Sequence, residues 1–352
     1  MTNIRFKNRL DQVGSEIWIK IAQIDELKGG WNAGINLSPQ FLGRLKRSVL
    51  VTSSGASTRI EGAKLSDQEV EKLMAGIRIQ KFANRDAQEV QGYFELLQNV
   101  FDSWQTVKFG ENTIKHFHRE LLKYVAKDQL HRGEYKKSEN KVEIIDEQGE
   151  KIGVLFATAP AYLTPKLMQE LTEWTNEMLE QKKYHPLLIM GNFLVEFLNI
   201  HPFTDGNGRL SRILTNLLML QSGYAYIPYV SHEKLVEDKK TAYYLALRQS
   251  QKTFSTASED LTPWLEFFLD LILDQSRMAI NLMSTEQIES GLSIKQLAVW
   301  NYLIQIPEAA PGEITTATQI PRPTVNQILT KLLKLKKIER LGLGRSTRYR
   351  RV

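Results

Sequence analysis

The chain has 352 residues, 42% of them apolar, which is enough for two or three domains with hydrophobic cores of their own. It contains no cysteine, which excludes disulfides and thiolate metal sites, and its six histidines are too scattered for a histidine-rich zinc site. No apolar run approaches eighteen residues and no signal-type segment opens the chain, so we expect a cytoplasmic protein without membrane contact.

The net charge of +6 is unevenly placed. Residues 291–352 hold eleven Lys or Arg against three Asp or Glu, a net of +8, while the rest of the chain carries −2. This asymmetry makes the C-terminal segment, rather than the remainder, the candidate for a nucleic-acid surface.

Helical patterns dominate the first 125 residues. Gly29-Gly30 predicts a loop after the first of them, and a short apolar segment follows at Arg44–Arg59. Ser66 and Glu69 form a capping box, which predicts the start of a helix that runs to Ala75 or beyond. The other predicted helices are Ile17–Leu27, Ala87–Trp104 and Asn112–Val125, the last with Asn112 as its N-cap.

A β-hairpin interrupts the helical pattern. Lys141–Ile145 alternates with period two, Asp146–Gly149 is typical of a turn, and Ile152–Phe156 predicts the second strand. Two prolines, Pro165 and Pro186, then open helices. These helices are Lys166–Gln181 and Leu187–Ile200, and the second is apolar nearly all round, as expected for the buried centre of a bundle.

The twelve residues 201–212, His201-Pro-Phe-Thr-Asp-Gly-Asn-Gly-Arg-Leu-Ser-Arg212, precede an apolar helical stretch that ends near Gly223. Asn207 is therefore expected at a helix N-terminus, where free N–H groups and the helix dipole bind anions such as phosphate. Arg209 and Arg212 are three apart and share a face from which both could reach one polyphosphate. The neighbouring glycines let backbone approach such a ligand closely.

The C-terminal segment resembles a winged helix-turn-helix. Its predicted elements are helices Ile294–Ile306, Glu313–Thr318 and Arg322–Lys334, followed by strands Ile338–Leu341 and Thr347–Arg351. In a DNA-binding version, the groove would face Arg322, Thr324, Asn326 and Gln327, and the phosphates would face Arg345, Arg348 and Arg350. Winged helices also serve as protein-docking or dimer modules, so DNA binding stays one alternative.

The twelve-residue stretch resembles the signature of the Fic family, His-Pro-Phe-x-Asp-Gly-Asn-Gly-Arg-x-x-Arg, at every fixed position. The resemblance covers about residues 100–270. It implies a mainly α fold, a helical Fic bundle with a short β-hairpin flap, to which the winged helix is added. The expected division is 1–99 for an N-terminal helical region, 100–275 for the Fic core and 290–352 for the winged helix.

The resemblance also implies roles for individual residues, with ATP and Mg²⁺ as cofactors. His201 would be the general base, and Asp205 would hold Mg²⁺ on the α- and β-phosphates. Arg209 would contact the inner phosphates and Arg212 the γ-phosphate. The loop and first helical turn that would bind the nucleotide comprise Gly206, Asn207, Gly208, Arg209, Leu210, Ser211 and Arg212.

Two further features follow from the resemblance. Tyr243 and Tyr244 match a tyrosine pair that contacts the nucleotide, and Gln251 stands where the family has Asn. Adjacent tyrosines on a helix are also common as packing residues. The hairpin at Ser138–Phe156 matches the flap, which docks a target peptide as an added strand.

A second motif lies upstream. Ser57-Thr-Arg-Ile-Glu61-Gly62 fits the family's inhibitory-helix pattern, Ser/Thr-x-x-x-Glu-Gly/Asn. A carboxylate delivered to Arg212 would pair with the guanidinium that otherwise fixes the γ-phosphate. Ser57, Glu61 and Gly62 are therefore the predicted inhibitory residues.

The implied activity is protein adenylyltransfer, in which AMP passes from ATP to a Ser, Thr or Tyr hydroxyl and pyrophosphate leaves. Gly208 and Arg212 favour AMP transfer over a kinase-like reaction. The expected partner is a protein with an exposed hydroxyl, including the chain itself, and the family favours a homodimer. The alternatives are removal of AMP by the same site, with Glu61 positioning a water, and a DNA-binding regulator whose Fic core senses nucleotide.

Overall fold

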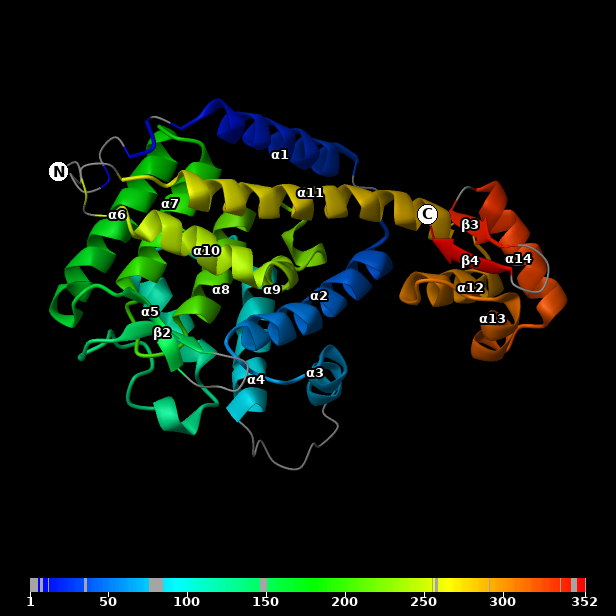
Figure 1. The fold of residues 1–352 in the computed structure, drawn as a ribbon, viewed down its shortest axis with the longest axis horizontal. Helices are drawn as coiled ribbons and strands as arrows, with labels where there is room; N and C mark the ends of the chain where they lie inside the picture. The colour runs from blue at the N-terminus through cyan, green and yellow to red at the C-terminus, as the bar shows by residue number, and fades with distance from the viewer. Residues whose placement is uncertain are drawn as a thin grey trace. The chain divides into compact units, whose positions relative to one another are not determined.

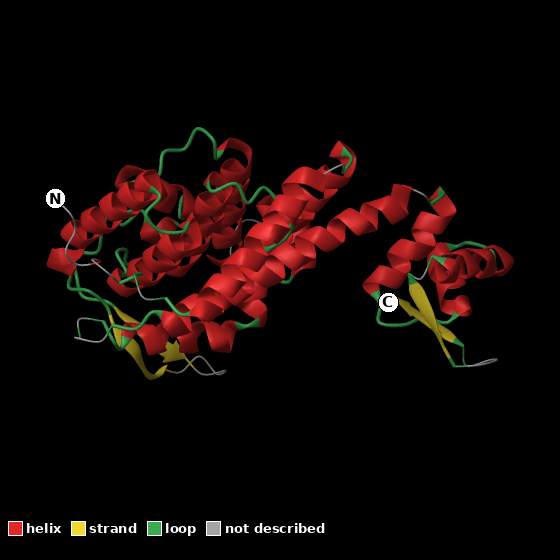
Figure 2. Ribbon diagram, turned by 90° about the horizontal axis from the view of Figure 1, so that it is seen from above, coloured by secondary structure: helices red, strands yellow, loops and turns green. Residues whose placement is uncertain are grey.

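The computed structural model describes the chain except residues 1–5, 7–8, 12, 35–36, 76–84, 146–150, 255, 257–258, 291, 336, 343–346 and 352. It divides into two compact units, Met1–Asn281 and Leu282–Val352. The fold is mainly helical, as predicted, and the sheets of the described residues are two antiparallel hairpins (Figure 2). The predicted boundaries of 99, 275 and 290 stay predictions.

The helices of the first unit can be followed in chain order in Figure 1. They are α1 (Ser15–Gly34), α2 (Pro39–Ile60), α3 (Asp67–Met74), α4 (Arg85–Ser103), α5 (Glu111–Leu121), α6 (Thr164–Gln181), α7 (Pro186–Ile200), α8 (Asn207–Gln221), α9 (His232–Asp238), α10 (Lys240–Gln251) and α11, which begins here and runs over Thr262–Ser290.

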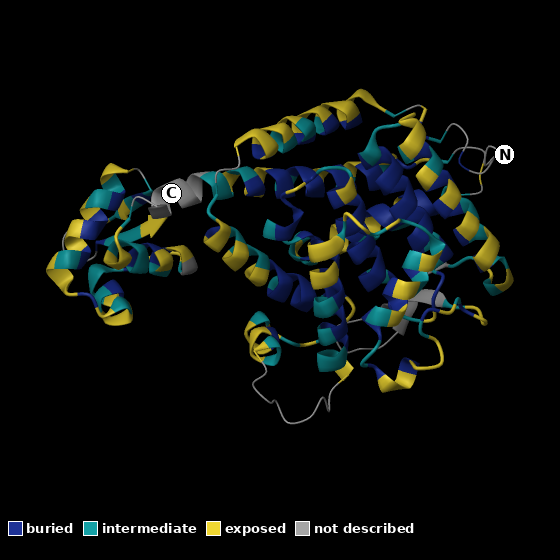
Figure 3. Ribbon diagram, turned by 180° about the vertical axis from the view of Figure 1, so that it is seen from behind, coloured by how far each residue is buried: buried dark blue, intermediate teal, exposed yellow. Residues whose placement is uncertain are grey.

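Helices α7 and α8 form the centre of this unit, and both are buried along almost their whole length (Figure 3). This confirms the prediction from the all-round apolar pattern of residues 187–200. Helix α7 packs against α6 and α8, so the loop that joins α7 to α8 starts and ends on rigid elements.

Helix α2 is longer than the short apolar segment predicted at Arg44–Arg59. Its small polar residues are core residues here together with its apolar ones. The hydroxyl of Ser54 donates to the carbonyl of Leu50 (2.7 Å) and that of Thr58 to the carbonyl of Ser54 (2.9 Å). Satisfied in this way, the hydroxyls can be buried where α2 packs against α4 and α9.

Two other boundaries differ from prediction. The expected loop at Gly29-Gly30 lies inside α1, which continues because Trp31 is fully buried and packs on the rings of Tyr226 and Tyr229. Helix α5 is capped by Gly110 rather than Asn112 and ends four residues before Val125. The Ser66 capping box is confirmed at the start of α3.

The predicted hairpin is present. Strand β1 (Lys141–Ile145) pairs antiparallel with β2 (Lys151–Ala157), in a register with two irregularities. The predicted turn at 146–149 lies outside the described residues. We keep the name flap for residues 138–157.

The second unit has its own hydrophobic core, which includes Trp300, Ile314 and Leu332. Its elements match the predicted ones in order and place. They are α12 (Ile294–Gln305), α13 (Pro311–Thr318), α14 (Arg322–Lys334) and the antiparallel strands β3 (Ile338–Leu341) and β4 (Arg348–Arg351). Across both units, no helix of the described residues is long and apolar enough to span a bilayer.

Candidate functional site

His201 ends α7 in a left-handed conformation (φ 51°, ψ 62°), with its N–H bonded to the carbonyl of Phe197. Its Nδ1 lies 3.3 Å from the carbonyl oxygen of Leu198, so we assign the proton to Nδ1, which leaves Nε2 as an acceptor. Burial lowers the pKa of His201 to about 4, and the nearby charge of Lys136 acts in the same direction. The ring is therefore neutral at pH 7 and can accept a proton.

The N-terminus of α8 lies six residues further on. Gly206 is its N-cap at φ 78°, a conformation that a Cβ would strain. The side chain of Asn207 accepts from the N–H of Phe203 (3.0 Å) and donates to its carbonyl (2.8 Å). Asn207 thus braces the loop with its side chain, while the first backbone N–H groups of α8 lack partners within the helix.

The carboxylate of Glu61 lies directly over this helix end. A Cβ on Gly208 would stand only 2.3 Å from Glu61 Oε1, so a larger residue at this position would require the carboxylate to shift. A carboxylate at a helix N-terminus is favoured by the helix dipole. Glu61 therefore lies beside the helix end at which an anion was predicted to bind.

Arg212, from the second turn of α8, holds Glu61 there. Its Nη2 is 2.7 Å from Glu61 Oε1 and 2.8 Å from the carbonyl oxygen of Ser57, and its Nε donates to Ser57 Oγ at 2.8 Å. Burial acts to lower the pKa of Arg212, but the charge of Glu61 and further interactions raise it above the usual value. The structure thus brings Ser57 and Glu61 together with Arg212, which lies far from both in the sequence.

A second arginine fixes the end of α2. Arg59 bonds Glu237 on α9 at 2.6 and 3.1 Å, the carbonyl of Leu65 at 2.8 Å and Asp67 at 3.0 Å. The motif residue Gly62 follows Glu61 and begins the turn to α3. These contacts fix the C-terminal end of α2, and therefore the position of the Glu61 side chain that follows it.

Asp205 lies on the other side of the loop. Its Oδ1 accepts from the N–H of Gly206 (2.6 Å), and its Oδ2 accepts from Arg209 (2.9 Å) and Arg85 (2.7 Å). Burial would raise the pKa of Asp205, but the guanidinium of Arg209 and these other donors lower it overall. Arg209 also contacts Glu89 at 2.8 Å, so Arg209 and Arg212 have different partners here.

The residues around Asp205 fit a Mg²⁺ ion that is also bound by phosphate oxygens. The described residues contain no cluster of three acidic or histidine side chains that could hold a metal alone. Mg²⁺ commonly takes one or two carboxylates together with phosphate oxygens and water, and Asp205, with a side chain 37% exposed beside the anion site, offers such a carboxylate.

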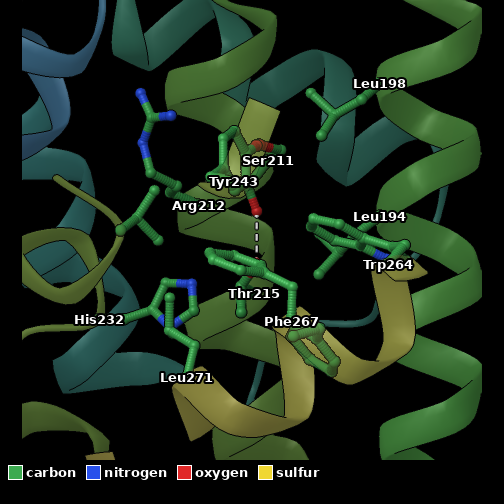
Figure 4. Close-up of a pocket in the computed structure, with 12 residues that line it drawn as sticks. Leu194, Leu198, Ser211, Arg212, Thr215, His232, Tyr243, Trp264, Phe267 and Leu271 are labelled. Atoms are coloured by element: carbon green, nitrogen blue, oxygen red, sulfur yellow. Dashed lines mark hydrogen bonds between the residues drawn. The ribbon is translucent and has the colours of Figure 1, made fainter. Parts of the chain in front are cut away.

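Tyr243 and Arg212 both line a small cavity of about 20 Å³, which has room for one water but not for a purine (Figure 4). Burial raises the pKa of Tyr243 to about 12 and that of Tyr244 well above its ordinary value. Leu210 and Ser211 are buried in the first turns of α8, whereas no hydrogen bond within the described residues joins the buried Gln251 to this cluster.

His118 is a site residue that the sequence did not reveal. It is fully buried; its Nε2 lies 3.0 Å from the carbonyl of Asp205, and its Nδ1 accepts from the N–H of Gly133 (2.9 Å). Its ring stacks on Phe203 at 3.8 Å. Because its loop partner is 87 residues away, only the folded chain shows that His118 supports the Asp205 loop.

Comparison with known proteins places these features in context. Residues 106–219 match the model of the Fic/DOC family. A probable protein adenylyltransferase of Aquifex aeolicus is 24% identical over 308 residues, which cover 87% of this chain and 86% of that protein. The protein adenylyltransferase Fic of Drosophila mojavensis is 30% identical over 104 residues, 30% of this chain but only 18% of that protein.

Solved structures agree with the fold. A Fic family protein from Desulfovibrio desulfuricans G20 is 27% identical, with a TM-score of 0.63 over 97% of each chain. Fic-1 from C. elegans, 21% identical, has a TM-score of 0.60 over 76% of this chain and 74% of its own. The predicted resemblance to the Fic family is confirmed.

The buried histidines predict an acid-sensitive fold. Burial lowers the pKa of both His118 and His232 to about 4, below the usual 6.5. Between pH 6.5 and 4 the unfolded chain therefore binds more protons, so the free energy of unfolding falls with pH. For His118 the loss is on the order of 2 kcal/mol at pH 5 relative to pH 7.

Urea unfolding of wild type and His118→Gln at pH 7 and pH 5 measures this loss. We expect the stability gap between the two proteins to shrink at pH 5 by about that amount. His116→Gln, at an exposed position on the same helix, is the matched control and should follow the wild type. A gap that is the same at both pH values would contradict this account.

Proposed function

The chain carries a Fic domain and is an enzyme of the nucleotidyltransferase type, and we propose that it moves AMP from ATP to protein hydroxyls under inhibition by Glu61. The observation that carries this proposal is a neutral His201 near a helix N-terminus beside which a carboxylate of the same chain is paired with Arg212. The names of the relatives support adenylyltransfer. The modified residue would be Ser, Thr or Tyr.

In the proposed reaction, Nε2 of His201 takes the proton of the target hydroxyl as its oxygen attacks the α-phosphorus. A new oxygen–phosphorus bond forms, the bond between the α-phosphorus and the bridging oxygen breaks, and pyrophosphate leaves. The first N–H groups of α8 would bind phosphate oxygens, and Arg212 would face the γ-phosphate.

Asp205 would hold Mg²⁺ once Arg85 has left its Oδ2. The bound cation would supply charge neutralisation on the phosphates. Arg209 is anchored to Glu89 and is 2% exposed, so it would stay in place while the more exposed Arg85 moves.

Inhibition follows from the place of Glu61. Its carboxylate and a γ-phosphate would be two anions at one helix end, and both need the same guanidinium, that of Arg212. ATP could bind only with its phosphates displaced from the position for in-line attack. The same carboxylate could also orient a water for removal of AMP, which is the alternative activity of this site.

A peptide would add to the flap through backbone hydrogen bonds, which leave little side-chain code to read. Modification of the chain itself, a homodimer and a cytoplasmic location all stay predictions.

Replacement of Glu61 by glycine should raise AMP incorporation from labelled ATP by about tenfold or more, because one charge-assisted bond of Arg212 is removed. Intact-mass analysis of the protein and of added lysate measures the adduct. The double variant Glu61→Gly/His201→Ala is the control and should incorporate about 10²–10⁴-fold less than Glu61→Gly. Equal incorporation by Glu61→Gly and wild type would remove the inhibitory role.

In the Glu61→Gly background, His201→Ala should lower transfer by about 10²–10⁴-fold, since a positioned base is lost, while ATP binding stays largely intact. Calorimetric titration with ATP and the adduct assay separate the two effects. His131→Ala, at an exposed histidine, is the matched control. Transfer near the parent rate in the His201→Ala protein would rule out a base at this position.

DNA binding by the second unit is the second candidate function. Arg322, Asn326 and Gln327 of α14 are exposed, which favours it, and Thr324 is half-buried. Of the predicted phosphate contacts, Arg348 is paired with Glu313 and Glu308, Arg350 is paired with Glu339, and Arg345 lies outside the described residues.

The protein should bind a fluorescent DNA duplex with an affinity that falls steeply as the salt concentration rises. The Arg322→Ala substitution should weaken this binding. An absence of retention even at low salt would leave protein docking as the role of this unit.

A further inference from the structure

The left-handed backbone of His201 needs an external support. For a residue other than glycine this conformation costs about 1 kcal/mol or more, and it persists only where the surroundings enforce it. The chain also leaves α7 at this point, so the carbonyls of residues 200–203 require partners outside the helix. Two residues supply donors to all four: Lys136, just before the flap, and Asn140, near its start.

Lys136 donates hydrogen bonds to the carbonyls of residues 200 and 202. Its ammonium donates to the carbonyl of Ile200 at 3.0 Å, and its backbone N–H donates to that of Pro202 at 2.8 Å. The side chain is almost fully buried, with the residue 4% exposed. A charge this deep is held only when its protons are bonded, so the contact is specific rather than a passing surface pair.

Asn140 donates hydrogen bonds to the other two carbonyls, those of residues 201 and 203. Its amide nitrogen donates to the carbonyl of His201 at 3.3 Å and to that of Phe203 at 3.0 Å. Its amide oxygen accepts from the Lys136 ammonium at 2.8 Å. The two residues therefore act on the loop as one bonded pair.

The same pair reaches the far end of the flap. The third proton of the Lys136 ammonium goes to Thr158 Oγ1 at 2.9 Å, and the Thr158 hydroxyl donates to the carbonyl of Asn140 at 2.8 Å. Asn140 directly precedes β1 and Thr158 directly follows β2. Both stems of the hairpin thus meet at one buried ammonium, which also bonds the end of α7.

We propose that Lys136 and Asn140 are positioning residues that hold His201 in its left-handed conformation and join it to the base of the flap. This inference rests on the proposed role of His201 as the base. A peptide that adds to the flap edge would then dock on an element bonded to the catalytic loop, so target binding and base placement are coupled. Neither residue touches the substrate in this account.

The test uses the full chain with Lys136→Met, in the Glu61→Gly background, and Lys137→Met at the exposed neighbouring position as the matched control. Titration of the His201 ring by NMR should give a pKa raised by about half a unit or more, because a nearby positive charge is lost. The kcat for AMP transfer should fall at least about tenfold, while KM for ATP changes less than about twofold. Values equal to those of Lys137→Met would overturn the proposal.

Asn140→Asp covers the case in which Lys136→Met does not fold. It is near-isosteric, keeps the acceptor for Lys136 and removes both donations to the loop. The Cα chemical shift of His201, which reports its backbone conformation, should move and kcat should fall. An unchanged shift and kcat in folded Asn140→Asp would refute the positioning role of Lys136 and Asn140. If the parent protein transfers no AMP, the proposed function fails, yet the NMR measurements still test whether Lys136 and Asn140 hold His201 in place.

Discussion

One ion pair organises the site: Arg212 to Glu61, at the N-terminus of α8. The helix end offers free N–H groups and a positive dipole, and the guanidinium adds a full charge, so this position favours an anion. The chain supplies its own, a carboxylate so close to Gly208 that a side chain at this position would displace it. Activity and inhibition would thus be alternative occupants of one anion position.

Neighbouring residues hold the two partners of this ion pair in position. Arg59 fixes the end of α2 on α9, and Ser57 holds Arg212 through two further bonds. On the other side, the α7–α8 loop turns twice through left-handed residues, His201 and Gly206, between two buried helices. Bonds from the base of the flap hold the first turn, and the His118 ring lies against the second.

The sequence predicts much of this because the motif residues are local. The spacing from His201 to Arg212 places loop, helix end and charges, and the all-round apolar pattern of α7 predicts its burial. What it could not give are contacts set by tertiary packing. His118, Lys136 and Asn140 are polar residues with no local pattern, and their partners lie about 60 to 90 residues away. The length of α2 was also underestimated from the sequence. Its buried hydroxyls bond carbonyls of their own helix and can therefore pack like apolar groups.

The most direct measurement is a crystal structure of Glu61→Gly with magnesium and a non-hydrolysable ATP analogue. The account predicts the γ-phosphate where the Glu61 carboxylate lies now, bonded to Arg212 and to the first N–H groups of α8, with the metal on Asp205. A nucleotide bound elsewhere, or an Arg212 still turned only to Ser57 beside an empty helix end, would contradict it.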